Sequence, residues 1–440
     1  MAPHEYFCDL GNGTFADTAG DPDGDGSGAV YTGPGGYLAA IWGFGNATAL
    51  AAGDTLWLKG TGDVERLVFI ECESTDVSAW AAGDVVRNLT GSGNHWTGVV
   101  LMANDDPVGG VGGNTFLWIW LDAAYDVTDV SSNLADGIEN TTKAENDSAL
   151  LDAVAEGVQW GDNSGDLTDG YIKVIGVNSS WVEDETYAVL DGNSVATYGF
   201  YIPSSSSNSK VLIKHLYVTR TSSYGWYMNG TVSDDWVLYH CAAILCAAGT
   251  VLHRFIGATV VRFRAESNTS YGLKEGQYGY DAMYAFCKAS GNGGIGIGGT
   301  SSRLTFVGCL SFDNYNNFEC DDGTFINCTI DAGSEDGVLQ LSATRLRMVG
   351  CRVTSNGTDD VEYGVNLAAT GWLIPMYSYF GGNLGAGAAA NDVEGYKLDL
   401  VGNTWEGTDT DQGYMDTATD DYNLDPDEAT TFSTAINLDA

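Results

Sequence analysis

Five cysteines recur along the middle of the chain at a nearly constant spacing. Cys241, Cys287, Cys309, Cys328 and Cys351 are separated by 46, 22, 19 and 23 residues, so the first interval is two periods of 23. The last three share one motif: a large apolar residue, a β-branched residue, a small or polar residue, and then cysteine. A period of roughly 20–25 residues with strand-like alternation is typical of a solenoid of β coils.

A helical repeat does not fit this pattern. The chain has 59 glycines, and its apolar runs are rich in Val, Ile, Thr and aromatic residues, which prefer strands. We therefore expect an all-β fold in which equivalent residues of successive coils stack about 4.8 Å apart. The five cysteines should form an internal ladder of buried side chains. Disulfides are the less favoured alternative, and no Cys-x-x-Cys pair supports a zinc site.

The repeat divides the chain into four parts. Residues 1–71 are predicted to form an N-terminal cap and the first coils, 161–405 the solenoid body, and 406–440 a closing segment. The repeat is interrupted in residues 72–160, where Gly-rich turns separate short apolar runs around Trp80, Trp96 and Trp118. Such runs predict an inserted antiparallel β module. Residues 145–154 read as a short helix that leads back to the coils.

Three segments resemble one known fold family. They are Glu5–Asp9 with the Gly/Asp-rich stretch after it, residues 37–58 with the sequence AGDT at 52–55, and Asp421–Pro426. Together they resemble the right-handed parallel β-helix proteins of the pectate-lyase-like superfamily and their phage spike relatives. The resemblance implies a right-handed parallel β-helix with an N-terminal capping helix near 37–41. It names no substrate, because one fold serves many functions.

The charge of the chain excludes some partners. Asp and Glu number 59 against 18 Lys and Arg, a net charge of −41. Nucleic acid and anionic membrane surfaces need clustered cations, so we expect no binding to either. No apolar run approaches the roughly 18 residues of a membrane span, and the first residues do not read as a secretory signal. Strong brine would screen the self-repulsion of such a chain, so we expect a halophilic source. The alternative is an ordinary protein with an acidic surface that does not stick to polyanions.

The chemistry-bearing residues form no recognised catalytic constellation. Lyase-type catalysis would need an Arg base beside a calcium-holding carboxylate cluster, and the candidates in similar corners are Arg303, Arg345, Arg347 and Arg352 with Asp313, Asp321 and Asp322. In a chain with 59 acids such proximity arises by chance. His215 and His240 lie 25 residues apart, so they are expected to stack in adjacent coils as polar wall residues.

One segment resembles half of a calcium loop. Asp21, Asp23 and Asp25 alternate as in the first positions of such a loop, but Thr32 stands where a bidentate carboxylate would be needed. The alternatives are a loose cation site and a plain turn. No cofactor is required, and Ca, Mg or Na ions bound by surface carboxylates are the only ions we expect.

Tyrosines near the predicted loop corners offer a binding surface. A tyrosine ring is apolar on its face and polar at its tip, which suits sugar recognition. The alternative is that about half of them stack inside the coils. The candidate glycan-binding residues are Tyr271, Tyr278, Tyr280, Tyr377 and Tyr379, and Tyr284 belongs to the same group.

These features predict a structural virion spike, a capsid turret or tail spike of a tailed virus that infects a halophilic archaeon. It would sit on the virion surface, touch other virion proteins, and bind host cell-surface glycan or S-layer glycoprotein. A stack of parallel coils leaves unpaired strand edges at its two ends, which a partner subunit can cover. We therefore expect a homo-oligomer, with a trimer as the leading hypothesis. The alternative is a polysaccharide lyase or hydrolase on the same scaffold, and we regard an enzyme as the weaker hypothesis.

Overall fold

In a computed structural model, the chain forms two compact units, Met1–Ala248 and Gly249–Ala440. The structure describes residues 5–10, 17–19, 29–32, 52–73, 77–81, 83–89, 96–105, 115–122, 124–134, 137–143, 146–154, 158–160, 170–202, 207–229, 232–253, 255–276, 280–300, 303–342, 344–357, 363–368, 371–381, 383, 393–394, 396–397, 403–405 and 413–414. The predicted capping helix near 37–41 and the predicted closing segment at 421–426 lie outside these residues.

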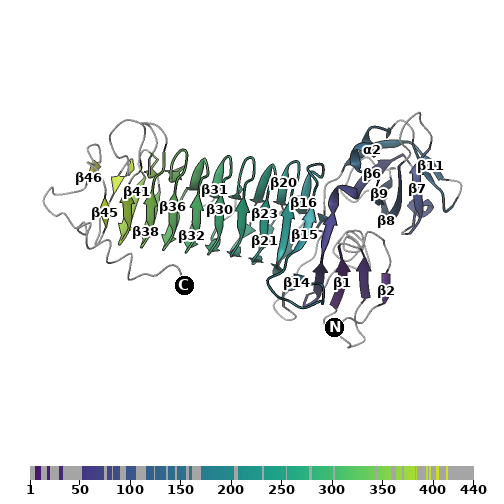
Figure 1. The fold of residues 1–440 in the computed structure, drawn as a ribbon, viewed down its shortest axis with the longest axis horizontal. Helices are drawn as coiled ribbons and strands as arrows, with labels where there is room; N and C mark the ends of the chain where they lie inside the picture. The colour runs from purple at the N-terminus through teal and green to yellow at the C-terminus, as the bar shows by residue number, and fades with distance from the viewer. Residues whose placement is uncertain are drawn as a thin grey trace. The chain divides into compact units, whose positions relative to one another are not determined.

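The second unit is built of stacked rungs, each contributing one strand to each of three parallel sheets (Figure 1). The first sheet holds β26 (Thr259–Val261), β29 (Met283–Ala285), β32 (Leu304–Val307), β35 (Gly323–Ile326), β38 (Arg345–Val349), β41 (Trp372–Met376), β44 (Tyr396–Lys397) and β46 (Gly413–Tyr414). The second sheet holds β27 (Arg264–Glu266), β30 (Lys288–Ser290), β33 (Leu310–Phe312), β36 (Thr329–Asp331), β39 (Arg352–Thr354), β42 (Tyr379–Gly381) and β45 (Thr404–Trp405). The third sheet holds β24 (Ala248–Leu252), β28 (Leu273–Glu275), β31 (Ile295–Gly299), β34 (Asn316–Cys320), β37 (Val338–Gln340), β40 (Val365–Asn366) and β43 (Val393–Glu394), and the short β25 (Phe255–Ile256) stands apart from these three.

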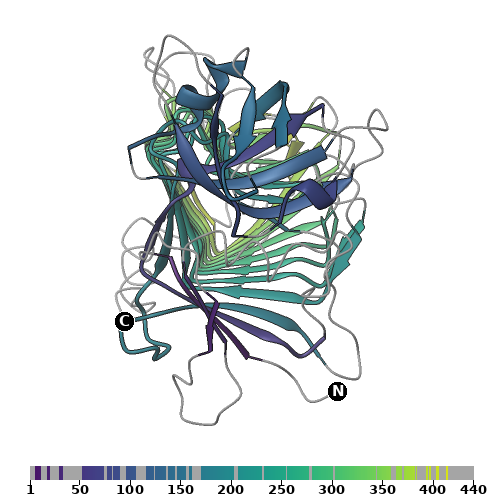
Figure 2. The same ribbon diagram turned by 90° about the vertical axis from the view of Figure 1, so that its right-hand side faces the viewer.

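The first unit contains the same kind of rung (Figure 2). Its first sheet holds β2 (Asp17–Ala19), β3 (Ala29–Thr32), β1 (Glu5–Asp9), β4 (Thr55–Lys59), β14 (Ile172–Val177), β18 (Val211–Lys214) and β22 (Val237–Tyr239), parallel except for β2. Its second sheet holds β5 (Thr61–Asp63), β15 (Ala188–Asp191), β19 (Leu216–Thr219) and β23 (Ala242–Ile244). Its third sheet holds β13 (Val158–Gln159), β16 (Tyr198–Ile202) and β20 (Tyr224–Met228), and β17 (Ser207–Ser209) pairs with β21 (Val232–Asp234) outside these sheets. The predicted parallel β-helix is thereby confirmed.

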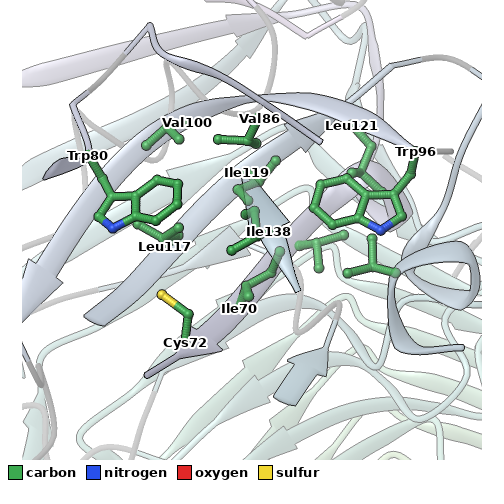
Figure 3. Close-up of a cluster of buried hydrophobic side chains, with 12 residues drawn as sticks. Ile70, Cys72, Trp80, Val86, Trp96, Val100, Leu117, Ile119, Leu121 and Ile138 are labelled. Atoms are coloured by element: carbon green, nitrogen blue, oxygen red, sulfur yellow. The ribbon is translucent and has the colours of Figure 1, made fainter. Parts of the chain in front are cut away.

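An antiparallel module interrupts the first unit. Its strands run in the order β11 (Asn146–Ser148), β10 (Ile138–Asn140), β7 (Val85–Asn88), β8 (Thr97–Asp105), β9 (Thr115–Leu121), β6 (Leu67–Cys72) and β12 (Leu150–Val154). The short helices are η1 (Val64–Arg66), η2 (Val77–Ala79) and α2 (Val127–Ser131), the last begun by a capping box of Asp126 and Asp129. The buried core of the module runs between Trp80 and Trp96, with Ile119 and Ile138 between them (Figure 3).

The helix predicted over residues 145–154 was wrong. Those residues hold β11 and β12, and β12 pairs antiparallel with β6 along Phe69–Cys72. Backbone pairing with a neighbouring strand outweighs the modest helix preference of a Leu- and Ala-containing segment. The inserted module is therefore an almost pure β sheet.

Each rung of the second unit turns at corners where one residue adopts a left-handed backbone. Between the first and second sheets these residues are Arg262, Phe286, Gly308, Asn327, Gly350 and Tyr377, and between the second and third they are Ser267, Gly291, Asp313, Ala332 and Ser355. A left-handed residue reverses the side-chain alternation locally and lets the chain bend sharply. The repeated corner therefore keeps the same residues pointing inward in every rung.

The residue after the first of these corners is a buried cysteine in four successive rungs. Cys287, Cys309, Cys328 and Cys351 are each at most 2% exposed, and their thiols are free. The thiol of Cys309 donates to the carbonyl of Tyr284 one rung before, at 3.3 Å. In the first unit, Cys241 follows the left-handed His240 and is likewise buried. At these positions the thiols pack as small apolar groups that satisfy neighbouring carbonyls.

A file of buried asparagines follows the second corner. Each side-chain amide donates to the next asparagine oxygen at 2.7–2.9 Å, in the order Asn268, Asn292, Asn314, Asn317, Asn356 and Asn383. Aromatic rings fill another part of the interior, where Phe306 stacks on Phe325 at 4.7 Å between ring centroids. Such a chain of amides satisfies the polar groups that the corners bury.

Candidate functional site

Two strands of the first unit repeat one tyrosine motif. β16 reads Tyr-Gly-Phe-Tyr-Ile and β20 reads Tyr-Gly-Trp-Tyr-Met, 26 residues apart. The strands are parallel and in register, which pairs Tyr198 with Tyr224 and Tyr201 with Tyr227. The residues between the tyrosines are buried, whereas all four tyrosines are partly exposed. The register thus gathers four tyrosines on the outer side of one sheet, and we call this set the tyrosine platform.

The four rings of the tyrosine platform stack on one another. Ring centroids lie 4.7 Å apart for Tyr198 and Tyr201, 5.2 Å for Tyr198 and Tyr227, and 4.9 Å for Tyr224 and Tyr227. The Tyr198 ring is nearly parallel to both Tyr201 and Tyr227, at 14° and 18°. Burial raises the pKa of the Tyr227 phenol, and the neighbouring Tyr224 raises it further. The Tyr227 hydroxyl therefore stays protonated, beside rings that are partly exposed.

An aromatic layer inside the coil fixes the tyrosine platform. Phe200 and Trp226, the buried partners in the same strands, lie 5.1 Å apart, and Trp160 lies 6.0 Å from Phe200. The indole of Trp226 donates to the carbonyl of Ala242 at 3.0 Å. Gly199 leaves no room for a side chain, because an added Cβ would lie 2.1 Å from a methyl of Val218. Rigid backing lowers the entropic cost of binding a ligand on the outer rings.

Sequence reasoning missed the tyrosine platform. Its signal is present in the sequence, because the two five-residue motifs are identical at three positions and apolar in both at the other two. The cysteine repeat drew attention to the second unit, where the predicted tyrosines lie. A comparison of segments one coil apart would have found the pair.

The structure places the predicted glycan-binding tyrosines on different parts of the second unit. Tyr271 precedes β28 and has the Lys274 ammonium 3.9 Å from its ring centroid, and Tyr280 lies before β29 with the Arg303 guanidinium at 5.3 Å. Tyr377 stands at the corner before β42, and Tyr379 begins β42. Tyr278 lies outside the described residues. Their assignment as a glycan site stays a prediction.

Tyr284, which the sequence grouped with these tyrosines, lies inside the coil. It stacks on Phe306 at 5.4 Å, and its hydroxyl donates to the buried carboxyl of Glu275. Burial, followed by the Glu275 charge, raises the pKa of this phenol well above its usual value. Tyr284 is therefore a core residue, which agrees with the alternative that part of the group is internal.

His215 and His240 lie in adjacent rungs, as expected from their spacing, but their rings pack edge to face, at 87°. Their ring centroids lie 5.2 Å apart, and Tyr187 lies 5.1 Å from His240. Burial lowers the pKa of His215, and the neighbouring His240 lowers it further. Among the described residues, no group of three or more His, Cys, Asp or Glu is arranged to hold a metal ion. Asp21, Asp23 and Asp25 lie outside those residues, so their cation site stays a prediction.

The arginines weighed as catalytic candidates make surface ion pairs where the structure shows their partners. Arg303 lies 2.9 Å from Asp281, and Arg347 lies 3.5 Å from Asp322. Exposed pairs of this kind contribute at most about 1 kcal/mol. Burial raises the pKa of Glu319 and of Asp321, and Lys274 partly offsets the rise at Glu319. Glu319 lies in β34 and Asp321 directly follows it, so both lie at the end of one strand of the third sheet.

Comparisons with known proteins give likenesses of fold. No protein-family model matches the chain, and no curated protein matches its sequence. Pectate lyase Pel9A is 11% identical over 93% of this chain and 79% of its own, with a TM-score of 0.48. The A-module of mannuronan C-5 epimerase AlgE6 from Azotobacter vinelandii is 20% identical over 58% of this chain and 81% of its own, with a TM-score of 0.36. Tailspike protein 2 of bacteriophage CBA120 is 10% identical over 76% of this chain and 56% of its own, with a TM-score of 0.30.

Proposed function

We propose that this chain is a glycan-binding spike whose tyrosine platform holds sugar rings. The observation that carries the proposal is the stack of Tyr198, Tyr201, Tyr224 and Tyr227 on the outer side of β16 and β20. Sugar C–H faces pack on aromatic faces, and the phenol hydroxyls supply hydrogen bonds at the edge. The platform spans two neighbouring strands about 4.8 Å apart, and its rings already stack on one another, so we expect a sugar to contact the outermost ring face and the exposed ring edges.

The proposed setting is the surface of a virus particle that infects a host living in strong salt. The spike would be a homo-oligomer, with a trimer as the leading hypothesis, and other virion proteins would hold it. Its ligand would be a host cell-surface glycan or S-layer glycoprotein. The charge of −41 supports a saline setting, because salt screens the self-repulsion of such a chain. Mass spectrometry of purified particles tests the setting, and absence of this chain from every particle preparation would overturn it.

Glycan binding is tested on the tyrosine platform itself. A glycan array on the full chain identifies a ligand, and titration calorimetry with a monovalent oligosaccharide then compares variants. We expect Tyr201→Ala and Tyr227→Ala each to raise Kd about tenfold, because each removes one stacking face. Tyr201→Phe keeps the face and should lose less.

Tyr379→Ala serves as the matched control, since Tyr379 belongs to the sequence-predicted group. It should bind as the unaltered chain does. If Tyr379→Ala loses binding and Tyr201→Ala does not, the site lies in the second unit and the platform assignment is wrong. No binding of any glycan by the full chain would overturn the proposed function as a whole.

A second candidate function is cleavage of a polysaccharide. The register places Lys274 and Glu319 on either side of Gly298 in the third sheet of the second unit, two strand spacings apart. A carboxyl with a raised pKa, such as Glu319, can protonate a leaving oxygen, and Asp321 is a second carboxyl nearby in sequence. Release of oligosaccharides that Glu319→Gln abolishes would support this function, and release unaffected by Glu319→Gln would dismiss this site.

A further inference from the structure

One rung of the second unit exposes three large apolar side chains across the first sheet. Tyr280, Met283 and Phe286 are 38%, 39% and 62% exposed. They lie along one strand and its two corners, with Met283 in β29 between them. Scattered exposed apolar residues need no explanation, but a row within a single rung forms a patch.

Phe286 occupies a backbone position that suits glycine or asparagine. Its φ is 55°, in the left-handed region, and the same corner holds Gly308, Asn327 and Gly350 in the next three rungs. A bulky exposed residue at such a position is costly to the fold. Its ring covers Gly308, where an added Cβ would lie 2.8 Å from the Phe286 ring. Arg262 and Tyr377 occupy the same corner in other rungs, so what distinguishes Phe286 is an apolar ring that is 62% exposed.

The apolar surface continues along the sheet from this rung. The register aligns Val261, Ala285, Val307 and Ile326 on the outward side of four adjacent strands. All but Ala285 are partly exposed. We call Tyr280, Met283 and Phe286, together with Val261, Ala285 and Val307, the anchor patch. Aromatic residues, Met and Arg are the side chains enriched in protein–protein interfaces, so the composition favours a protein partner over a sugar.

The charge around the anchor patch is opposite to that of the whole chain. Residues 259–266, 280–290 and 303–312 form the patch, its corners and the adjoining second-sheet strands. They contain four cations, Arg262, Arg264, Lys288 and Arg303, against two carboxylates, Asp281 and Glu266, a local net of +2. The chain as a whole carries −41. Opposite charges attract, and like charges repel. An acidic surface on a second copy of this chain therefore complements the charge of the anchor patch.

We propose that the anchor patch docks against an acidic surface of a second copy of this chain. Such a contact joins two different surfaces, so it can close into a ring of three copies. The inference rests on the proposed function in that it names the surface through which the homo-oligomer forms. Phe286 and Met283 are the anchors, and Arg262 orients the partner.

The test measures self-association of the full chain by sedimentation velocity at 1–100 µM, in dilute buffer and in 2 M salt. Phe286→Asn removes the anchor while supplying a residue that the left-handed position prefers, so the melting temperature should not fall. We expect the association constant to drop at least tenfold. Met283→Ser is a second variant with the same expectation, and it serves if Phe286→Asn folds poorly.

Tyr377→Asn is the matched control, because Tyr377 occupies the equivalent corner position, is 42% exposed, and lies outside the anchor patch. It should associate like the unaltered chain. A monomeric unaltered chain under both conditions overturns the inference, as does unchanged assembly of both patch variants. Loss of assembly in Tyr377→Asn alone also overturns it. If the patch variants lose assembly but the proposed function is right, they still bind a monovalent sugar as the unaltered chain does. If the proposed function is wrong, neither the variants nor the unaltered chain binds it.

Discussion

Glu65 is a carboxyl group held out of water at the start of the inserted module. Its side chain is 8% exposed, and one carboxyl oxygen has no hydrogen-bond partner among the described residues. Its pKa is raised from 4.5 to about 7, chiefly by burial; Asp63 and Asp191 contribute to the rise, whereas its own backbone and Arg66 oppose it. The folded state therefore holds a proton on Glu65 that the unfolded chain releases above pH 4.5.

We expect this proton to make stability depend on pH. The stabilisation is complete below pH 4.5 and is lost as pH rises toward 7, because the unfolded chain then binds fewer protons than the folded chain. Glu65→Gln removes the dependence, so it should stabilise the chain at pH 8 by up to about 3 kcal/mol and little at pH 4.5. Urea unfolding at both pH values measures this. An equal effect of Glu65→Gln at both values would contradict it.

A second prediction for single residues concerns the reactivity of the cysteine thiols. Eight cysteines are buried with free thiols, including Cys287, Cys309, Cys328 and Cys351. Burial raises the pKa of Cys320 well above its usual value, which keeps that thiol protonated and unreactive. In the native state, a thiol reagent should label at most one of the nine cysteines. All nine should react in denaturant, and rapid native labelling of several would show that the rungs open readily.

At the scale of the element, the asparagine file shows how one rung compensates for another. The rung with β36 has Gly333 where its neighbours have Asn314 and Asn356, and the side chain of Asn317 fills the gap by bonding to both. A Cβ on Gly333 would lie 2.9 Å from the Asn317 amide nitrogen. Gly333 is therefore required because the side chain of Asn317, which lies in β34, occupies the space next to it.

This substitution pattern predicts a rescue. Asn317→Ala removes three hydrogen bonds of a buried side chain, one from Asn314, one to Asn356 and one to the carbonyl of Asp331. It should therefore lower the free energy of unfolding by about 2–3 kcal/mol. Gly333→Asn alone should also destabilise, because its side chain meets Asn317. In the double variant the new asparagine occupies the standard place, and part of the loss should be recovered. Denaturant titration of all four forms gives the coupling, and strictly additive losses would refute it.

How far the sequence predicts the fold can be seen in particular residues. The spacing of Cys309, Cys328 and Cys351 predicts parallel rungs, because inward positions repeat only when strands stack in register. The role of Asn317 could not be predicted, since its place depends on a glycine in the next rung. The β strand at 150–154 was read as a helix because its pairing with β6 lies far away in sequence. The tyrosine platform was missed although its motif is local, and the exposure of Phe286 required the corner geometry.

At the scale of the whole molecule, the dominant quantity is the charge of −41. Self-repulsion of this size opposes a compact state at low ionic strength. At about 1 M salt the screening length falls to roughly 3 Å, and most of the repulsion disappears. Stability of this chain is therefore expected to depend on its ionic surroundings more than on any single surface ion pair.

We expect the melting temperature to rise by several degrees between 0.05 M and 1 M KCl, with most of the rise below about 0.5 M. An uncharged solute such as sucrose at equal osmolality is the control, because it stabilises by exclusion and not by screening. A rise that is equal in sucrose, or no rise in KCl, would show that self-repulsion does not limit stability.

The left-handed corners have a further consequence for how such a chain can change over time. Between β14 and β15 the backbone runs through residues 178–187, whereas between β18 and β19 a single residue, His215, makes the same passage. Both routes deliver the next strand in the same register. Lengthening or shortening at a corner thus leaves neighbouring rungs untouched. A lineage of such proteins can exchange its outward loops, and so its specificity, while the scaffold beneath is inherited unaltered.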